Sequence, residues 1–235
     1  MPAWLHTLAI LMLMAGALSA LYILLDVARH PQRMAVMTLV WPATGLYAGP
    51  LGAWAYSAWG RQTAASDGEG MESPAPPFPV MVGKAACHCG AGCTFGDILA
   101  EWLAFFVPAV TVWLGYGTLV ADRIFAVWIL DYALAFLIGI AFQYATIVPM
   151  RDLSPGQGII AAVKADALSL TAWQVGMYGA MAVMQFWVFG TLLGRRLEVD
   201  TVEFWAAMQI AMICGFLTSY PVNWWLIRRG IKEAM

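Results

Sequence analysis

Six long apolar runs set the limits on what this chain can fold into. Each run exceeds the about 20 residues that an α-helix needs to cross a hydrocarbon layer about 30 Å thick. Of the 235 residues, 62% are hydrophobic and only 11% are charged, whereas soluble domains have about 25% charged residues. The sequence therefore predicts an all-α, polytopic transmembrane helix bundle of about six spans. The predicted spans lie at about 4–26, 34–59, 98–121, 124–149, 169–193 and 203–227.

One long polar stretch between these runs divides the chain. Residues 60–85 contain Gly, Ser, Pro and acidic residues without a hydrophobic period, which is typical of a flexible connector. The connector separates an N-terminal two-helix membrane hairpin at 1–59 from a four-helix membrane domain at 86–235, which begins with a Cys/His motif. Pro108 lies inside the third run, and because a proline removes a backbone hydrogen bond it predicts a kinked helix there.

The basic residues indicate an orientation. Six spans would place both termini on one side of the membrane, and lysine and arginine are slightly more frequent on that side. The positive-inside rule then predicts that both termini are cytoplasmic. The first run lacks a basic n-region, so we interpret it as a retained span and not as a signal peptide.

Three cysteines and a histidine lie within seven residues shortly before the third run. Cys87, His88, Cys89 and Cys93 form the pattern C-H-C-x3-C, with intervening glycines that predict a tight loop. Thiolate and imidazole bind soft or borderline metals. A closed zinc site usually has two pairs of ligands separated by a longer insert, and this motif has only one short group. The C-x-x-C-H motif for haem attachment is absent. An iron–sulfur cluster would need a fourth thiolate, and the remaining cysteine, Cys214, lies in the last predicted span. The pattern favours an open copper(I) site, with zinc as the alternative.

Ionisable residues in the apolar runs form a second set of candidates. Asp97 and Glu101 are spaced i, i+4, so they should share one helix face directly after the thiols. Buried ionisable groups by default mark an ion or proton path, and Asp131, Lys164 and Asp166 belong to the same class. We expect Lys164 to pair with Asp131 or Glu101. The alternative is structural: Asp97 caps the helix, Glu101 pairs with a lysine, and the cysteines only support the fold.

Methionines recur at helical spacing in the last two predicted spans. Met177 and Met181 share one face, followed by Met184, and Met208 and Met212 share another. Thioethers bind copper(I) and little that is harder. Methionine also fills gaps in apolar cores without any metal, so packing is the alternative interpretation of these residues.

Several segments together resemble a bacterial membrane family known as domain of unknown function 4396. The resemblance covers the four-helix domain and not the first hairpin. It implies a bacterial inner (plasma) membrane location with the lipid bilayer as partner, and no established activity. The segments are HCGAGCTFGDILAEW (88–102), DYALAFLIGIAFQY (131–144), KADALSLTAWQVGMYG (164–179), FWAAMQIAM (204–212) and GFLTSYPVNWWLIRRGIKEAM (215–235).

The motifs favour transport or metal handling over catalysis. Hydrolase and phosphate-loop motifs are absent from the sequence, and so are the basic, aromatic-rich stretches of nucleic-acid binders. We predict that the Cys/His loop captures a transition metal, copper(I) first, and passes it along the carboxylate and methionine faces. Two alternatives remain. One is a membrane thiol–disulfide oxidoreductase that uses Cys89 and Cys93, and the other is a non-catalytic subunit of a homo-oligomer or larger membrane complex with structural zinc.

Overall fold

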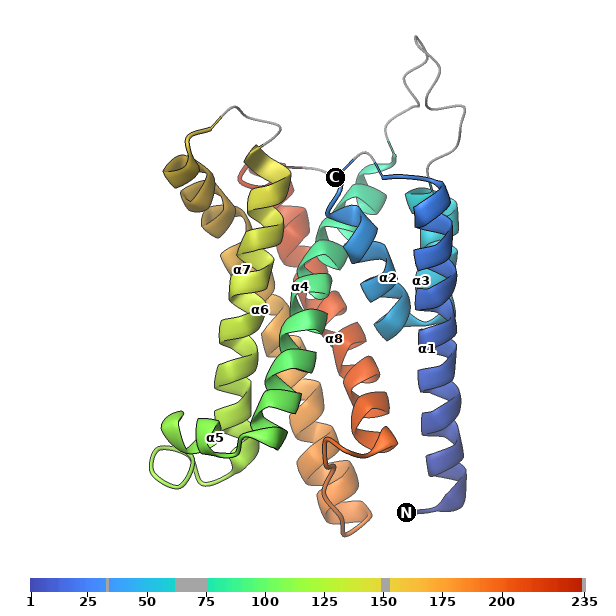
Figure 1. The fold of residues 1–235 in the computed structure, drawn as a ribbon, viewed down its shortest axis with the longest axis vertical. Helices are drawn as coiled ribbons and strands as arrows, with labels where there is room; N and C mark the ends of the chain where they lie inside the picture. The colour runs from blue at the N-terminus through green and yellow to red at the C-terminus, as the bar shows by residue number, and fades with distance from the viewer. Residues whose placement is uncertain (33, 62–75, 149–152, 234–235) are drawn as a thin grey trace.

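A computed structural model describes residues 1–32, 34–61, 76–148 and 153–233. These residues form an all-α bundle without a β-strand, which confirms the predicted fold class. In Figure 1 the N-terminus lies at the lower end of the bundle and the last helix ends at the upper end. The long helices are α1 (Ala3–Arg29), α4 (Phe78–Phe106), α6 (Arg123–Ile147), α7 (Pro155–Ala182) with its π-helical continuation η4 (Val183–Leu192), and α8 (Val202–Arg228).

The number of membrane-crossing helices differs from the predicted six. Among the described residues, four helices are long and apolar enough to cross a membrane: α1, α6, α7 with η4, and α8. Helix α4 is long enough, with 29 residues, but it contains Lys84, Asp97 and Glu101. It lies at the centre of the bundle with the other helices around it (Figure 1). An enclosed helix can contain polar groups that would be unfavourable on a lipid-facing surface.

The second predicted span, at about 34–59, is a re-entrant hairpin that does not cross the bundle. Its two arms enter and leave at the upper end (Figure 1). The break between them is at Gly49, whose φ of 58° and ψ of −135° favour glycine. Pro50 begins the next helix, a position that tolerates proline because the first N–H has no helical partner. The hairpin consists of α2 (Met37–Ala48), α3 (Pro50–Ala55) and the short π-helix η1 (Tyr56–Gly60).

Contacts with α1 determine how deep this hairpin reaches. Its turn at Gly49 lies beside Gly16, in the middle of α1. At its returning end, the Tyr56 hydroxyl donates to Asp26 Oδ2 at 2.8 Å, and Arg61 donates to both Asp26 oxygens at 2.9 and 3.0 Å. Because Asp26 lies near the end of α1, the hairpin covers only about half of that helix. A break at this depth is tolerated only inside protein or beside a cavity, and Gly49 is buried.

Because the second run doubles back, the first turns of α1 and α8 lie at the same end of the bundle. His6 Nδ1 of α1 lies 2.7 Å from Glu203 Oε1 of α8, so the first turns of these two helices lie together at the lower end. The chain leaves α8 at the opposite end (Figure 1). Because the hairpin does not cross, the described helices do not make the six predicted crossings, and the predicted side of the termini stays a prediction.

Helix α4 begins and ends earlier than the third predicted span. It starts at Phe78, inside the predicted connector at 60–85, of which residues 62–75 lie outside the described part of the chain. It ends two residues before Pro108, so the expected kink is a helix end. The proline has no N–H and its ring clashes with a continuing helix, and it instead precedes the short helix α5 (Ala109–Trp113).

Small residues allow α4 and α6 to pack closely. Gly92 and Gly96 lie one turn apart on α4, in the small-xxx-small pattern of membrane helix contacts. A Cβ on Gly96 would lie 2.5 Å from the backbone nitrogen of Ala135, and one on Gly92 would lie 3.0 Å from Gly139 Cα. This contact brings the polar side chains of the two helices to short range.

Gly49→Ala is expected to lower the free energy of unfolding by about 1–3 kcal/mol, the usual cost of a sparsely populated backbone conformation. The nearest atom to an added Cβ would be 3.9 Å away, so backbone strain and not overlap would cause the loss. Thermal denaturation of detergent-purified protein measures it. Gly179→Ala is the control, because nothing lies within 4 Å of a Cβ there. Equal stability of the two variants would contradict the hairpin turn.

Candidate functional site

The predicted Cys/His loop is a continuous part of helix α4. Its four side chains are buried but point in different directions, because a helix separates neighbouring residues by about 100°. Cys89 and Cys93 share one face. Cys87 instead packs in a separate cluster with residues of α1 and α2, and His88 Nε2 lies 3.4 Å from Thr146 Oγ1 on α6. The predicted flexible loop is therefore wrong, because these residues are helical, whereas the predicted open metal site stays a prediction.

The glycines that predicted this loop serve helix packing. A Cβ on Gly90 would lie 2.3 Å from the ring of Trp173, and Gly92 contacts Gly139 as described above. No group of three His, Cys, Asp or Glu side chains placed to hold a metal ion is found among the described residues.

Helix geometry connects the thiols to the carboxylates instead. Cys89, Cys93, Asp97 and Glu101 recur at four-residue intervals, so they form one slanted row along α4 that turns around the helix by about 120° from Cys89 to Glu101; this row is termed here the α4 stripe. Each has an exposed fraction of 3% or less. The four-residue spacing is present in the sequence, but the loop that the glycines predict over the cysteines would not place these four side chains in one row.

Three carboxyl groups meet in the lower half of the bundle. Asp131 of α6 is an electrostatic neighbour of Asp97 and Glu101 on α4. Neither oxygen of Asp97 or of Asp131 has a hydrogen-bond partner among the described residues. The buried amide of Gln174 lies beside Asp97, also without a hydrogen bond of normal geometry. Because an unpaired buried charge is strongly unfavourable, these groups require protons or a cation.

Lys164 does not make the pair that the sequence predicted with Asp131 or Glu101. It is exposed on α7 and lines a pocket of about 470 Å³ near the upper end of the bundle. The reason is the direction of the helices (Figure 1). Helix α7 begins at the upper end, and Lys164 lies in its first half. Helix α4 ends and helix α6 begins at the lower end, and Glu101 and Asp131 lie near those two helix ends.

The buried lysine is Lys232, directly after α8, and nothing local in the sequence marked it. Its Nζ donates to Asp166 Oδ1 at 2.9 Å and lies 3.2 Å from both Cys89 Sγ and Ser169 Oγ. Burial alone would lower the pKa of Lys232, but the Asp166 carboxylate and Cys89 raise it above its ordinary value. The upper end of the α4 stripe therefore ends at a charged ammonium.

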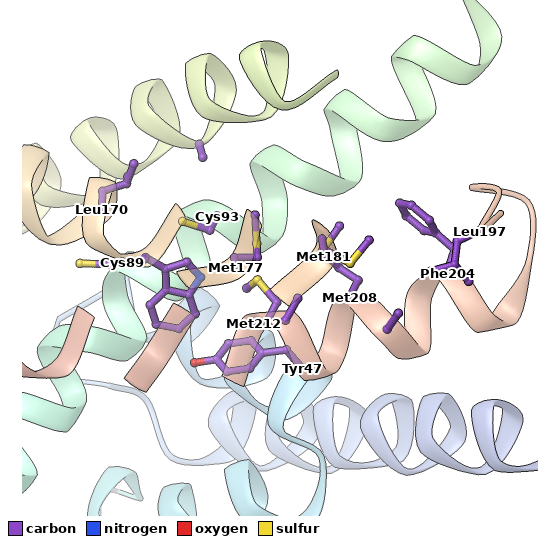
Figure 2. Close-up of a cluster of buried hydrophobic side chains, with 14 of the residues drawn as sticks. Tyr47, Cys89, Cys93, Leu170, Met177, Met181, Leu197, Phe204, Met208 and Met212 are labelled. Carbon is purple, nitrogen blue, oxygen red and sulfur yellow. The ribbon is translucent and has the colours of Figure 1, made fainter. Parts of the chain in front are cut away.

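The predicted methionine faces and two of the cysteines meet in one buried core cluster, termed the sulfur cluster. In Figure 2 the methionine side chains continue the line of the two thiols between α4, α7 and α8. Tyr47 of the hairpin closes one side of it and packs edge-on against Trp173, with ring centroids 5.7 Å apart. The six members of the sulfur cluster are Cys89, Cys93, Met177, Met181, Met208 and Met212.

A cavity of about 290 Å³, termed the central cavity, is lined by Asp97 of the stripe and by Met208 and Met212 of the sulfur cluster. It lies between α1, the hairpin, α4 and α8. Asp97 is the one charged residue among those that line it, and Tyr47, Met208 and Met212 are on its other walls. Re-entrant helices that end near mid-bundle commonly border ion sites in transporters.

A second opening, the lower vestibule, reaches the other end of the stripe. It also has a volume of about 290 Å³, and Glu101 lies on its wall. Its rim is charged and includes Arg123, Glu198 and the ion pair between Arg196 and Asp122. The lower carboxylate of the stripe is thus accessible from a polar surface.

The geometry of α4 bears on the two alternatives from the sequence, a thiol–disulfide oxidoreductase and a subunit with structural zinc. Cβ atoms one helical turn apart lie about 5–6 Å from each other, whereas a disulfide requires about 3.5–4.5 Å. Cys89 and Cys93 are both free thiols, and a disulfide between them would require α4 to unwind. A closed zinc site requires four converging ligands, which the described residues of the motif do not provide.

Comparison with known proteins locates this site within one sequence family. The model for the domain of unknown function (DUF4396) matches residues 80–232. No curated protein and no solved structure matches the chain. The matched segment contains the α4 stripe, the sulfur cluster and Lys232, whereas α1 and the re-entrant hairpin lie outside it.

Proposed function

The chain belongs to the domain of unknown function 4396 family, and we propose from the geometry of its core that it is a membrane carrier for a soft monovalent cation, copper(I). The observation that supports this most directly is the α4 stripe, in which two thiols and two carboxylates line one buried helix face. A cation in a low-dielectric core requires negative charge and ligands at close range, and the stripe supplies both.

The sulfur cluster supports copper(I) over other cations. Copper(I) is soft and accepts thiolate and thioether ligands in low coordination numbers, whereas sodium, potassium and magnesium prefer oxygen. Packing alone explains any single methionine. Four methionines of α7 and α8 lie in the same buried cluster as the two thiols of the stripe.

The order of groups defines a path. An ion that enters the lower vestibule meets Glu101, and one turn further it meets Asp97 at the wall of the central cavity. Met208 and Met212 line the same cavity, and Cys93 follows on α4. The sequence contains no nucleotide-binding motif, so a concentration gradient or an ion gradient would drive the movement.

Serine substitutions in the stripe test the proposal. We expect Cys89→Ser with Cys93→Ser to lower uptake of Ag(I), a redox-stable substitute for copper(I), into proteoliposomes by about tenfold or more, because serine retains a hydrogen-bonding group but removes the soft ligand. Cys87→Ser should leave uptake near the wild-type rate, since Cys87 packs in the other cluster. Cys214→Ser, in a half-buried position of α8, is the matched control.

Methionine variants complete the same test. Met208→Leu with Met212→Leu preserves volume and should lower uptake, whereas Met14→Leu on the exposed face of α1 should not. Wild-type Ag(I) uptake in both the serine and the leucine variants would refute copper(I) as the substrate. Proton or sodium flux in the absence of Ag(I) uptake would instead assign the stripe to a hard cation.

A further inference from the structure

The ammonium of Lys232 lies in a cage of acceptor atoms that come from α4 and α7. Asp166 Oδ1 is 2.9 Å away, and Cys89 Sγ and Ser169 Oγ are each 3.2 Å away. The side chains of Lys232 and Asp166 are 0% and 1% exposed. One oxygen of Asp166, Oδ2, has no hydrogen-bond partner among the described residues, so within this part of the chain the cage has an unused ligand atom.

The cage is held together without the lysine. The Cys89 thiol lies 3.1 Å from Asp166 Oδ1 and the Ser169 hydroxyl lies 3.3 Å from the same oxygen. Ser169 is fixed further because its carbonyl accepts from the Ser219 hydroxyl of α8 at 2.9 Å. The atoms that surround the ammonium therefore belong to α4 and α7, whereas the ammonium itself comes from the chain beyond α8.

That terminal segment is attached by a short turn. Gly230 has a φ of 66°, a left-handed conformation that ends the helix and reverses the chain. The backbone nitrogens of Ile231 and Lys232 donate to the Leu226 carbonyl at 3.0 and 3.4 Å. Lys232 is thus directed back into the bundle from a short turn after α8.

We propose that Cys89, Asp166 and Ser169 form a second cation-binding site at the upper end of the α4 stripe, which in this structure holds the Lys232 ammonium in place of a free soft monovalent cation. The charge matches, because the ammonium and a monovalent ion each have one positive charge, and the oxygen and sulfur atoms that accept hydrogen bonds from the ammonium are atoms that can bind an ion. The identity of the free cation rests on the proposed function, and the new element is the exchange between cation and lysine. While Lys232 occupies the cage, the stripe is closed at its upper end.

Silver binding by the purified full chain tests this exchange. We expect Lys232→Met to bind one more equivalent of Ag(I) than the wild-type chain, measured by native mass spectrometry or calorimetry in detergent. Lys164→Met, which removes an exposed lysine of the same helix bundle, should bind no more than wild type. Lys232→Met with Asp166→Asn should also lose the extra equivalent, because the double variant removes the carboxylate that binds the ion.

Thermal unfolding provides a second readout, since Lys232→Met leaves Asp166 without its partner and is expected to be less stable. Ag(I) should raise the unfolding temperature of Lys232→Met and should have a smaller effect on Lys232→Met with Asp166→Asn. If Lys232→Met shows neither extra Ag(I) nor stabilisation by Ag(I), the Lys232–Asp166 pair only anchors the C-terminal segment. Ag(I) binding and thermal unfolding are both measured without transport, so they test the exchange at Lys232 even if the uptake experiment fails. If these two measurements fail, the proposed transport of copper(I) is still tested separately by uptake.

Discussion

Asp97→Asn is expected to reduce Ag(I) uptake into proteoliposomes by about two orders of magnitude. Asp97 is the one charged residue on the wall of the central cavity, and a carboxylate about 4 Å from a monovalent ion stabilises it by about 4 kcal/mol at an effective dielectric constant of 20. A loss of about 3 kcal/mol already corresponds to a hundredfold change in an equilibrium constant. Asparagine has nearly the same shape, so the change tests charge and not packing.

Asp26→Asn is the matched control for this prediction. Asp26 lies on α1, where it accepts hydrogen bonds from Tyr56 and Arg61 outside the stripe. We expect this variant to lose some stability because it weakens the base of the re-entrant hairpin, and to retain wild-type uptake. Wild-type uptake in Asp97→Asn would show that the central cavity is not on the path of the ion.

The apolar runs predicted the fold class but not the number of crossings. A run of about 26 residues at 34–59 satisfies any length criterion for a span, and the sequence shows a break at Gly49 and Pro50 without showing the direction of the chain after it. The contacts that return the hairpin to the end of α1 involve Asp26 and Arg61, which are far apart in sequence. Hydropathy contains no information about such a contact.

The site was predicted in its residue types and not in its geometry. The spacing of Cys89, Cys93, Asp97 and Glu101 is regular in the sequence, but Gly90 and Gly92 were interpreted as loop residues, a normal inference for soluble proteins. In a membrane bundle, small residues instead allow helices to approach closely. Gly90 packs against the ring of Trp173, and Gly92 packs against Gly139. A test for four-residue periodicity across the glycines would have found the stripe.

Lys232 could not be found in this way. It lies in a short polar terminal segment, next to residues that look like a solvated end, and its partners Asp166 and Cys89 lie 66 and 143 positions earlier in the chain. The sequence did predict that a buried lysine pairs with a carboxylate. The pairing with a buried carboxylate that was expected of Lys164 is made by Lys232, and only the tertiary structure distinguishes the two lysines.

Gly96→Ala is expected to cause the largest loss of stability, about 3 kcal/mol, the upper part of the usual range for overpacking. The added Cβ would lie 2.5 Å from the backbone nitrogen of Ala135, and a backbone atom cannot rotate away as a side chain can. The measurement is thermal unfolding in detergent. Gly83→Ala on the same helix is the control, since nothing lies within 4 Å of its Cβ and alanine favours a helix more than glycine does.

The same substitution connects the packing of α4 and α6 to the site. Asp97 follows Gly96 directly, and Asp131 lies one turn before Ala135, so moving the helices apart also moves the two carboxyl groups apart. We therefore expect folded Gly96→Ala protein to take up less Ag(I) per molecule than Gly83→Ala protein. If Gly96→Ala retained wild-type stability, the close α4–α6 contact would be wrong. If it lost stability but retained full uptake per folded molecule, the spacing between Asp97 and Asp131 would not matter for the ion path.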